Sequence, residues 1–498
     1  DWSLAEGWST VPIDNRPYQY TGGGLAIAEL NGDDWLDVYL PTAGQGHLLL
    51  SDGSGGWMDA STKGLPDESG LSVGACAADP DADGDVDIYL VNLHEADQLL
   101  LNNGEGQFSD ATSDAGLGGE ALDGTSCTWA DVDGDDDLDL LVANHYEGEH
   151  LGPAILKGSF SAAHDHKLYI NEGDLLFSDQ SERLPSSFRG GYGFVIAAED
   201  LDGDRIPELY GVHDFGPMWE PNQVVSLGRE DWETNDSITG LDLAIYGMGT
   251  AVGDLNGDGL PEFAMSSWGE IALVESTGDG SWVRSAAARG VVLSSEQESS
   301  WGMEFADIDN DGDEDLLAAF GPLVMPEDVA SEIEAVQGLV TLEDQPDAVF
   351  IQDDSGSFED EAARWGIDDR GIGRGFVVAD LNRDGWLDIV KRDLGGDSIA
   401  WRASCGDHTS LVVELAQEGA NLQAIGAEII ATIGSDKIRR KIRSGGTGHA
   451  SSGPAEAHIG MGSAEQIDRL VIIWPDGEYS QVEDVAPGRI QIHRSGTP

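Results

Sequence analysis

Residues 79–87 read Asp79-Pro80-Asp81-Ala82-Asp83-Gly84-Asp85-Val86-Asp87. Related stretches of the form [DE]-x-[DN]-x-D-x-x-x-[DE] begin at Glu29, Asp131, Asp200, Asp254, Asp307 and Asp380, which makes seven copies. Successive copies start 50, 52, 69, 54, 53 and 73 residues apart. Self-similarity at a period of this size indicates a repeat architecture, so these loops decide the fold.

The residue types in each loop are typical of a site for a hard cation. Side-chain oxygens at positions 1, 3, 5 and 9, with the carbonyl at position 7, converge when the chain turns tightly, and calcium binds six to eight oxygens. No His or Cys stands at a ligand position, which argues against zinc and copper. An EF-hand would need a Glu at position 12 and flanking helices. Solvated turns are the alternative, but seven in-register copies favour up to seven calcium ions, one per repeat.

The predicted ligands form one set of four side chains in each copy. In chain order they are Glu29, Asn31, Asp33 and Asp37; Asp79, Asp81, Asp83 and Asp87; Asp131, Asp133, Asp135 and Asp139; Asp200, Asp202, Asp204 and Glu208; Asp254, Asn256, Asp258 and Glu262; Asp307, Asp309, Asp311 and Asp315; Asp380, Asn382, Asp384 and Asp388. The turn also needs a residue that tolerates positive φ at position 6. Glycine meets this need in four copies, whereas Asp34, Asp136 and Arg205 replace it in the others, and Arg205 fits least well.

Short apolar runs such as Ile88 to Val91 and Phe376 to Val378 flank the loops and predict β-strands. Each repeat holds about four strands in about fifty residues, which is typical of a propeller blade. We therefore expect an all-β chain: a seven-bladed β-propeller over residues 1–403, with residues near 1–5 completing the seventh blade. Residues 404–498 predict a small β-sandwich-like domain, with strands at 411–415, 428–432, 438–442 and 469–473.

Motifs in both parts of the chain support a family resemblance. Residues 20–402 resemble the FG-GAP/VCBS repeats of integrin α-subunit propellers and of many bacterial secreted proteins. Residues 405–498 resemble the ASPIC/UnbV domain through Ile425-Gly426-Ala427, Ser444 to His449, His458 to Gly462 and Asp468 to Gly477. The combination resembles the cartilage-acidic-protein-like family, and the resemblance implies a secreted calcium-binding protein. Thr447-Gly448-His449 departs from the family, which usually has a Gly-Tyr pair there.

The composition limits the partners and the compartment. The formal net charge is -69, from 94 acidic and 25 basic residues, and such a surface repels nucleic acid and anionic membranes. The one basic stretch, 437–443, alternates like a strand face, and no apolar run is long enough for a transmembrane segment. The chain opens at Asp1 without a signal peptide, and we expect a processed chain that is secreted, periplasmic or on the cell surface. Cys76 and Cys127 are expected to be buried free thiols, with a bridge between them as the alternative.

A ligand site is expected on the face opposite the calcium loops, where strand 1 starts and strand 2 ends. Asn92, Asn144, His213, Ser267 and Asp393 occupy equivalent places there, beside His94, Glu95, His145, Tyr146, Asp214, Trp268 and Arg392, with Tyr192, Tyr246, Trp301 and Arg374 at strand starts. Insertions at 147–166 and 321–346 join this face, and 326–337 predicts a short helix. The histidines His145, His150, His164, His166 and His213 could form a second metal or acid–base site, or simply be solvated.

Two function classes remain open from the sequence. The first is a binding or adhesion module with structural calcium and a protein, glycan or small-molecule ligand at the axial mouth. The second is an enzyme in the same axial pocket, with catalytic candidates His145, His213, Asp214, Tyr246, Arg374 and Asp393. No established catalytic motif is present. The glycine-rich run 445–448 predicts a hairpin, with an anion cradle as the alternative.

Overall fold

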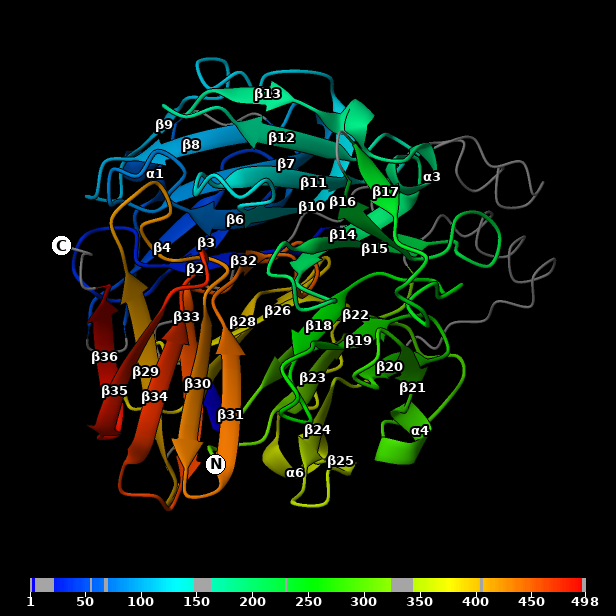
Figure 1. The fold of residues 1–498 in the computed structure, drawn as a ribbon. Helices are drawn as coiled ribbons and strands as arrows, with labels where there is room; N and C mark the ends of the chain where they lie inside the picture. The colour runs from blue at the N-terminus through cyan, green and yellow to red at the C-terminus, as the bar shows by residue number, and fades with distance from the viewer. Residues whose placement is uncertain are drawn as a thin grey trace.

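The structure is a computed structural model that describes residues 2–4, 22–53, 56–66, 70–146, 163–228, 231–323, 344–403 and 406–494. The described chain is almost entirely β (Figure 1), which confirms the expected class. Helical turns of three or four residues lie between strands: α1 (Ser61–Gly64), η1 (Ser181–Arg183), α3 (Ser186–Arg189), α4 (Ala286–Arg289) and α6 (Ala362–Trp365). The predicted helix at 326–337 and the insertion at 147–162 lie outside the described residues.

Sets of four antiparallel strands follow one another along the chain, and each is called a blade here. Blade 1 comprises β2 (Ala26–Ala28), β3 (Asp37–Leu40), β4 (His47–Ser51) and β5 (Trp57–Asp59). Blade 2 comprises β6 (Ser72–Ala78), β7 (Asp87–Glu95), β8 (Gln98–Asn102) and β9 (Phe108–Asp110). Blade 3 comprises β10 (Leu122–Ala130), β11 (Asp139–Asn144), β12 (Lys167–Asn171) and β13 (Phe177–Asp179). Blade 4 comprises β14 (Tyr192–Glu199), β15 (Glu208–Asp214), β16 (Gln223–Leu227) and β17 (Trp232–Thr234).

The remaining sets repeat this order. Blade 5 comprises β18 (Thr250–Gly253), β19 (Glu262–Ser266), β20 (Ile271–Ser276) and β21 (Trp282–Arg284). Blade 6 comprises β22 (Ser300–Ala306), β23 (Asp315–Phe320), β24 (Ala348–Gln352) and β25 (Phe358–Asp360). Blade 7 comprises β26 (Gly373–Ala379), β27 (Asp388–Asp393), β28 (Ile399–Ala403) and, from the other end of the chain, β1 (Trp2–Leu4), which pairs antiparallel with β28.

Buried apolar side chains hold neighbouring blades together. Valine, leucine and isoleucine from the strands of two adjacent blades form one cluster at each junction. The junction between blades 7 and 1 is built in the same way, with Val377 and Val390 beside Ile27 and Val38. Burial of apolar area, the dominant favourable term in folding, therefore acts around a closed ring. In every blade the acidic loop connects the first two strands, so all the loops lie on one face of the ring, which we call the loop face.

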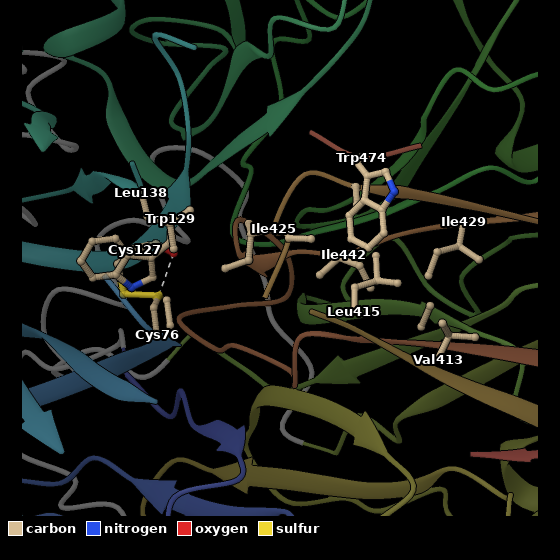
Figure 2. Close-up of a cluster of buried hydrophobic side chains, with 14 of the residues drawn as sticks. Cys76, Cys127, Trp129, Leu138, Val413, Leu415, Ile425, Ile429, Ile442 and Trp474 are labelled. Atoms are coloured by element: carbon tan, nitrogen blue, oxygen red, sulfur yellow. Dashed lines mark hydrogen bonds between the residues drawn. A yellow bond between two sulfur atoms is a disulfide. The ribbon is translucent and has the colours of Figure 1, made fainter. Parts of the chain in front are cut away.

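The C-terminal part forms two sheets. One is ordered β33 (Glu456–Gly462), β29 (Thr409–Ala416), β36 (Gly488–His493), and the other β31 (Asp436–Lys441), β30 (Glu428–Ile433), β34 (Ile467–Ile473), β35 (Tyr479–Val485). Side chains of both sheets share one apolar cluster. That cluster continues into blades 2 and 3, where Cys76, Cys127 and Trp129 belong to the same core as Ile425, Ile442 and Trp474 (Figure 2).

The segment 444–452 of the C-terminal part enters the middle of the ring, and we call it the axial plug. Its first residues form β32 (Ser444–Gly445), which pairs with β10 and lies beside β6 (Figure 1). Further on, Gly448 bridges Thr250 of blade 5, and Ser452 bridges Ala26 of blade 1. The plug side chains from His449 to Ser452 are at most 4% exposed. The glycine-rich run does contain a tight turn, with Thr447 bridged to Ser451, but the turn is buried between blades.

Cys76 and Cys127 form a disulfide, so the expectation of two free thiols is wrong. They lie on β6 and β10, the first strands of adjacent blades, with Cα atoms 5.9 Å apart. Both side chains are buried, as expected for cysteines in first strands. The bond lies against the axial plug, because a Cβ added at Gly445 would lie 3.0 Å from Cys76 Sγ. The third cysteine, Cys405, lies outside the described residues.

Candidate functional site

The acidic side chain at loop position 1 organises the backbone of each loop. In blade 3, for example, Asp131 accepts hydrogen bonds from the backbone N–H groups of Gly134, Asp135 and Asp136, at 2.7 to 3.2 Å. The longer Glu29 of blade 1 does the same with residues 31–33. Equivalent bonds form in the other loops. The first acid therefore fixes the turn on which the other predicted ligands lie.

Two positions in every loop adopt the left-handed backbone region. Position 6 has φ between 71° and 109° in all seven loops, including Arg205 at 75°. Position 4 has φ between 55° and 85°, even where it is Ala82, Asn310 or Arg383. The left-handed region is unfavourable for residues with a Cβ, so the surrounding bonds must hold these loops in place. Positive φ at position 6 was predicted from the sequence, whereas positive φ at position 4 was not.

The acid at position 9 ties each loop to the third strand of its blade. In six blades this carboxylate accepts the backbone N–H of the last residue of that strand, as Asp37 does from Ser51 at 2.8 Å. In blade 4, the Ser226 hydroxyl donates to Glu208 at 3.0 Å. These acids are all buried, at 0–3% exposure. Position 9 therefore belongs to the blade core as well as to the loop.

Carboxylates cluster closely in four loops. One oxygen from each of three side chains lies within 4.8 Å of the others in the sets Asp79, Asp81, Asp87; Asp131, Asp133, Asp139; Asp200, Asp202, Glu208; and Asp307, Asp309, Asp311. These are the four loops with Asp at position 3. The other three have Asn31, Asn256 or Asn382 there, which supplies an amide oxygen in place of a carboxylate.

Burial makes the charged form of these acids costly. It raises the pKa of Asp37, Asp139 and Glu262 to about 8 and that of Asp87 to about 9, with a smaller contribution from neighbouring acids. Like charges brought together out of water need a compensating cation or proton. These ligand atoms are all oxygens, they lie within a few ångströms of one another, and they carry an excess of negative charge. Such a donor set fits calcium.

On the opposite face, two of the predicted histidines pair with each other. His166 Nδ1 accepts the backbone N–H of Asn144 at 3.1 Å, so its proton is on Nε2, which donates to His213 Nε2 at 3.3 Å. His213 Nδ1 then donates to the carbonyl of Pro221 at 2.9 Å. Both rings are fully buried, and burial lowers the pKa of His213 to about 4. The two imidazoles are therefore neutral and link blade 3 to blade 4. Both ring nitrogens of His213 are hydrogen-bonded, so neither is left for acid–base chemistry.

Three other catalytic candidates lie near one another. His145 Nε2 is 3.6 Å from Asp214 Oδ2, and its ring is enclosed by Tyr192, Phe194 and Phe215. Tyr246 is half-buried against Phe215, and burial followed by the charge of Asp214 raises its pKa. These groups form an aromatic layer at the inner edge of blades 3 to 5.

Arg374 and Asp393 lie apart from that layer, in blade 7. The Arg374 guanidinium stacks on the Trp301 ring at 3.6 Å, and it donates to the carbonyls of Gly373 and Pro322. Asp393 belongs to a buried cluster around Lys391, whose Nζ lies 2.5 Å from Asp347, 2.7 Å from Asp369 and 2.9 Å from Asp393. The predicted catalytic residues therefore lie in separate places and do not form one site.

The rest of the predicted polar ring consists of buried strand ends and a few exposed side chains. Asn92, Asn144, Ser267 and Arg392 are at most 1% exposed, and Trp268 is partly buried. His94 is exposed, and its Nδ1 donates to the carboxylate of the buried Asp123 at 2.6 Å; His164 also approaches this carboxylate. Asp123 lies on β10, eight residues before the loop start Asp131, as Tyr192 does before Asp200, but it was not included in the predicted ring. His150 lies outside the described residues.

A layer of ion pairs on the loop face was not predicted from the sequence. Glu199, next to the blade 4 loop, accepts hydrogen bonds from Lys441 at 3.0 Å and Arg443 at 2.5 Å. Arg440 approaches Asp307 and Glu314, and the Gly460 N–H donates to Asp307 at 3.0 Å. The basic stretch 437–443 was visible in the sequence, but its acidic partners were not. The C-terminal part is thus docked on the loop face.

Comparisons with known proteins support the two-part organisation. The FG-GAP-like repeat family matches residues 79–142 and 235–318, and the ASPIC and UnbV family matches residues 417–496. Cartilage acidic protein 1 from Homo sapiens is 24% identical over 454 residues, covering 86% of this chain and 63% of that protein. The Xenopus tropicalis protein is 23% identical, covering 86% and 64%. The chain therefore spans less than two thirds of the length of these relatives.

Similar solved structures have low sequence identity. A lectin from Agrocybe aegerita that recognises non-reducing terminal N-acetylglucosamine is 19% identical with a TM-score of 0.43, covering 68% of this chain and 79% of its own. YCF48 bound to a D1 peptide is 10% identical with a TM-score of 0.43, covering 80% and 96%. In the described part of this chain, no helix is long and apolar enough to cross a membrane. The chain carries FG-GAP-like repeats and an ASPIC and UnbV domain, and over most of its length it is similar to cartilage acidic protein 1.

Proposed function

We propose that this chain is an extracellular, calcium-stabilised propeller that acts as a binding module. The loop architecture carries the proposal: each loop gathers oxygen ligands, of which the position 9 acid is buried in every blade, around a turn that its own first acid fixes. The cluster of three carboxylates within 4.8 Å in four loops is the observation that points most directly to a divalent cation. Cartilage acidic protein 1 and the FG-GAP-like repeats are the relatives expected for such a module.

Calcium would be held by the side chains at positions 1, 3, 5 and 9, with up to one ion per blade. When bound, it supplies positive charge at the point where these oxygens meet. The position 9 acid would then connect the ion to the third strand of the blade, because its carboxylate also accepts a backbone N–H of that strand. Since a ligand that binds only the folded state stabilises it, calcium would rigidify the loop face.

The described residues favour binding over catalysis. His213 is neutral and has both ring nitrogens hydrogen-bonded, and His145 is enclosed by aromatic rings. The plug residue His449 reaches the same layer, with its ring 5.5 Å from those of Phe194 and Trp301. A C-terminal segment therefore occupies the axis in which a catalytic pocket was expected. We place a protein, glycan or small-molecule ligand on the exposed part of the opposite face.

An extracellular location agrees with the disulfide as well as with calcium. Structural disulfides persist in oxidising compartments, and Cys76–Cys127 is buried between two blades. Extracellular calcium reaches concentrations that fill weak oxygen sites.

The test is calcium titration by calorimetry on the whole chain and on two matched variants of the blade 2 loop. Asp81→Ala removes the position 3 oxygen from a three-acid cluster, whereas Asp85→Ala changes position 7, which would contribute only its carbonyl. We expect Asp81→Ala to lose one high-affinity site and Asp85→Ala to keep the native stoichiometry. Equal stoichiometry in both variants, or no calcium uptake by the native chain, would contradict calcium binding at these loops.

A further inference from the structure

The acidic loop of blade 6 is covered more completely than the other six. Asp307 and Asp315, at positions 1 and 9, are each 1% exposed, and Asp309 at position 3 is partly buried. The position 5 acid, Asp311, is also partly buried, whereas the position 5 acid of every other loop is exposed. The blade 6 loop therefore has the same kind of ligands as the others but much less access to solvent.

Strand β33 of the C-terminal domain lies directly on this loop. The backbone N–H of Gly460 donates to the Asp307 carboxylate at 3.0 Å. The N–H of Gly462 donates at 2.7 Å to the carbonyl of Asn310, which is position 4 of the loop. The domain is thus bonded both to a predicted calcium ligand and to the backbone of the turn that carries it.

Glycine at residue 460 permits this close approach. A Cβ there would lie 2.6 Å from the carbonyl carbon of Asn310 and closer still to Asp307 Oδ2, so no larger residue fits without displacing the strand. Gly460 belongs to the run His458 to Gly462, one of the motifs through which residues 405–498 resemble the ASPIC/UnbV domain. The contact with the loop gives this motif a structural role.

The space that remains beside the loop also lies under the C-terminal domain. Asp307 lines a cavity of about 140 Å³, and Arg440 and His458 of the C-terminal domain line it as well. Nη2 of Arg440 is 3.9 Å from the Asp307 carboxylate. A path from this carboxylate to solvent therefore runs along the interface between the loop face and the domain.

The domain contacts other loops in a different way. At blades 3, 4 and 7 its hydrogen bonds involve the residue at position 6, which is not a predicted ligand. At blade 5 the side chain of Arg439 approaches the position 1 acid Asp254, with Nε 3.6 Å from the carboxylate. In all these loops the position 5 acid stays exposed, so an ion there would keep a direct route to solvent.

We propose that the C-terminal domain closes the calcium site of blade 6, so that the ion of this loop exchanges only when the segment 458–462 moves away from it. The proposal rests on the proposed calcium binding and deepens it, because it distinguishes one closed site from the open ones. An ion that leaves only from a locally opened state leaves more slowly, in proportion to the small population of that state. Since coupling between sites is reciprocal, calcium in this loop would also favour the docked domain.

The experiment measures isotope exchange on the whole chain. The chain is loaded with radioactive calcium and diluted into a large excess of ordinary calcium, so that the sites stay filled while the label leaves. Asp309→Ala removes the position 3 oxygen of the blade 6 loop. Asp81→Ala makes the same change in the blade 2 loop and is its matched control.

Two further variants loosen the docked segment without changing a ligand side chain. Gly460→Ala places a methyl group against the loop, whereas in the control Gly453→Ala the new Cβ would meet Val377 at an ordinary 3.7 Å. His408→Ala is the milder change, because it removes one hydrogen bond between the domain and the loop, from Nδ1 of His408 to the carbonyl of Asp309 at 2.9 Å.

We expect the native chain to release one equivalent of label at least about tenfold more slowly than the others. Asp309→Ala should lose this slow equivalent, and Asp81→Ala should lose a fast one and keep the slow one. Gly460→Ala and His408→Ala should both speed the slow release, with the larger effect in Gly460→Ala. Gly453→Ala should release its label as the native chain does.

Three results would overturn the proposal and leave calcium binding intact. They are a single release rate for all bound label, a slow equivalent that survives in Asp309→Ala, and an unchanged slow rate in the docking variants. Circular dichroism checks that these variants are folded, and His408→Ala decides the third point if Gly460→Ala is not. A native chain that binds no label would instead refute the proposed function.

Discussion

Acidification should stabilise the calcium-free protein and destabilise the calcium-loaded protein. The relevant groups are buried position 9 acids: burial raises the pKa of Asp37, Asp139 and Glu262 to about 8. A carboxyl group with a raised pKa binds its proton more tightly in the folded state than in the unfolded state. Without metal, such a group therefore adds stability as the pH falls through about 8 towards its ordinary value near 4, and this stability is lost again as the pH rises.

The size of the effect follows from the linkage relation. For one group with a folded pKa of about 8 and an ordinary unfolded pKa, lowering the pH from 8 to 6 adds roughly 2 kcal/mol to the free energy of unfolding. At the entropy of unfolding expected for a chain of this length, that raises Tm by about 2 °C per group. Several such groups ionised together would consume much of the roughly 5–15 kcal/mol that keeps a protein folded, and the proposed calcium ions would offset this loss at neutral pH.

The assay is a series of thermal melts from pH 8 to pH 5, in chelator and in excess calcium. In chelator, Tm should rise as the pH falls to 6, by several degrees if three or more loops respond. In calcium the same carboxylates are ionised and held by the metal, so Tm should be flat at first and then fall as protons compete with calcium. A calcium-free Tm that falls or stays constant between pH 8 and 6 would refute the reasoning, as would parallel curves in the two conditions.

Three further outcomes follow from the interface between the ring and the C-terminal domain. Thiol titration of the denatured chain should find one free thiol before reduction and three after it, and the Cys76→Ala/Cys127→Ala variant should lose up to about 4 kcal/mol of stability, as expected for a 51-residue loop. Glu199→Gln should lower the free energy of unfolding by about 3 kcal/mol at pH 7, because its two cationic partners lower the pKa of Glu199 to about 2. In the native chain this contribution should disappear as the pH falls from 4.5 to 2, which chemical denaturation across that range would show. Gly445→Ala should lower Tm clearly, since its Cβ would lie 2.3 Å from the Cys127 carbonyl, whereas Gly434→Ala, also at positive φ but in open space, should lose only about 1 kcal/mol.

The loop motif was predictable because everything that makes it lies within nine residues. Positions 1, 3, 5 and 9 could be read from the sequence, and so could the positive φ at position 6. Position 4 was not, because Ala82 and Arg383 carry no local signature of the left-handed region. Their conformation is imposed by the first acid of the loop, which binds the N–H groups that follow them.

The roles of the buried histidines and of the glycine-rich run could not be predicted, because their partners are distant in sequence. His166 and His213 are 47 residues apart and belong to different blades. Gly445 pairs with Thr128, and Ser452 with Ala26, across more than three hundred residues. A local reading of glycine at positive φ predicts a turn, and the turn exists, but only the ring around it explains why it is buried.

The acidic partners of the basic stretch 437–443 could not be predicted from the sequence either. In a chain with 94 acidic residues, composition cannot select the few carboxylates that a cationic strand will meet. The fold selects Glu199 and Glu314, which lie beside the loops of blades 4 and 6. Cations placed there partly offset the repulsion between loops that calcium would otherwise have to balance alone. The docked C-terminal domain and the proposed metal ions would therefore act on the same excess of negative charge, and this shared role accounts for the place of the basic stretch 437–443 on the loop face.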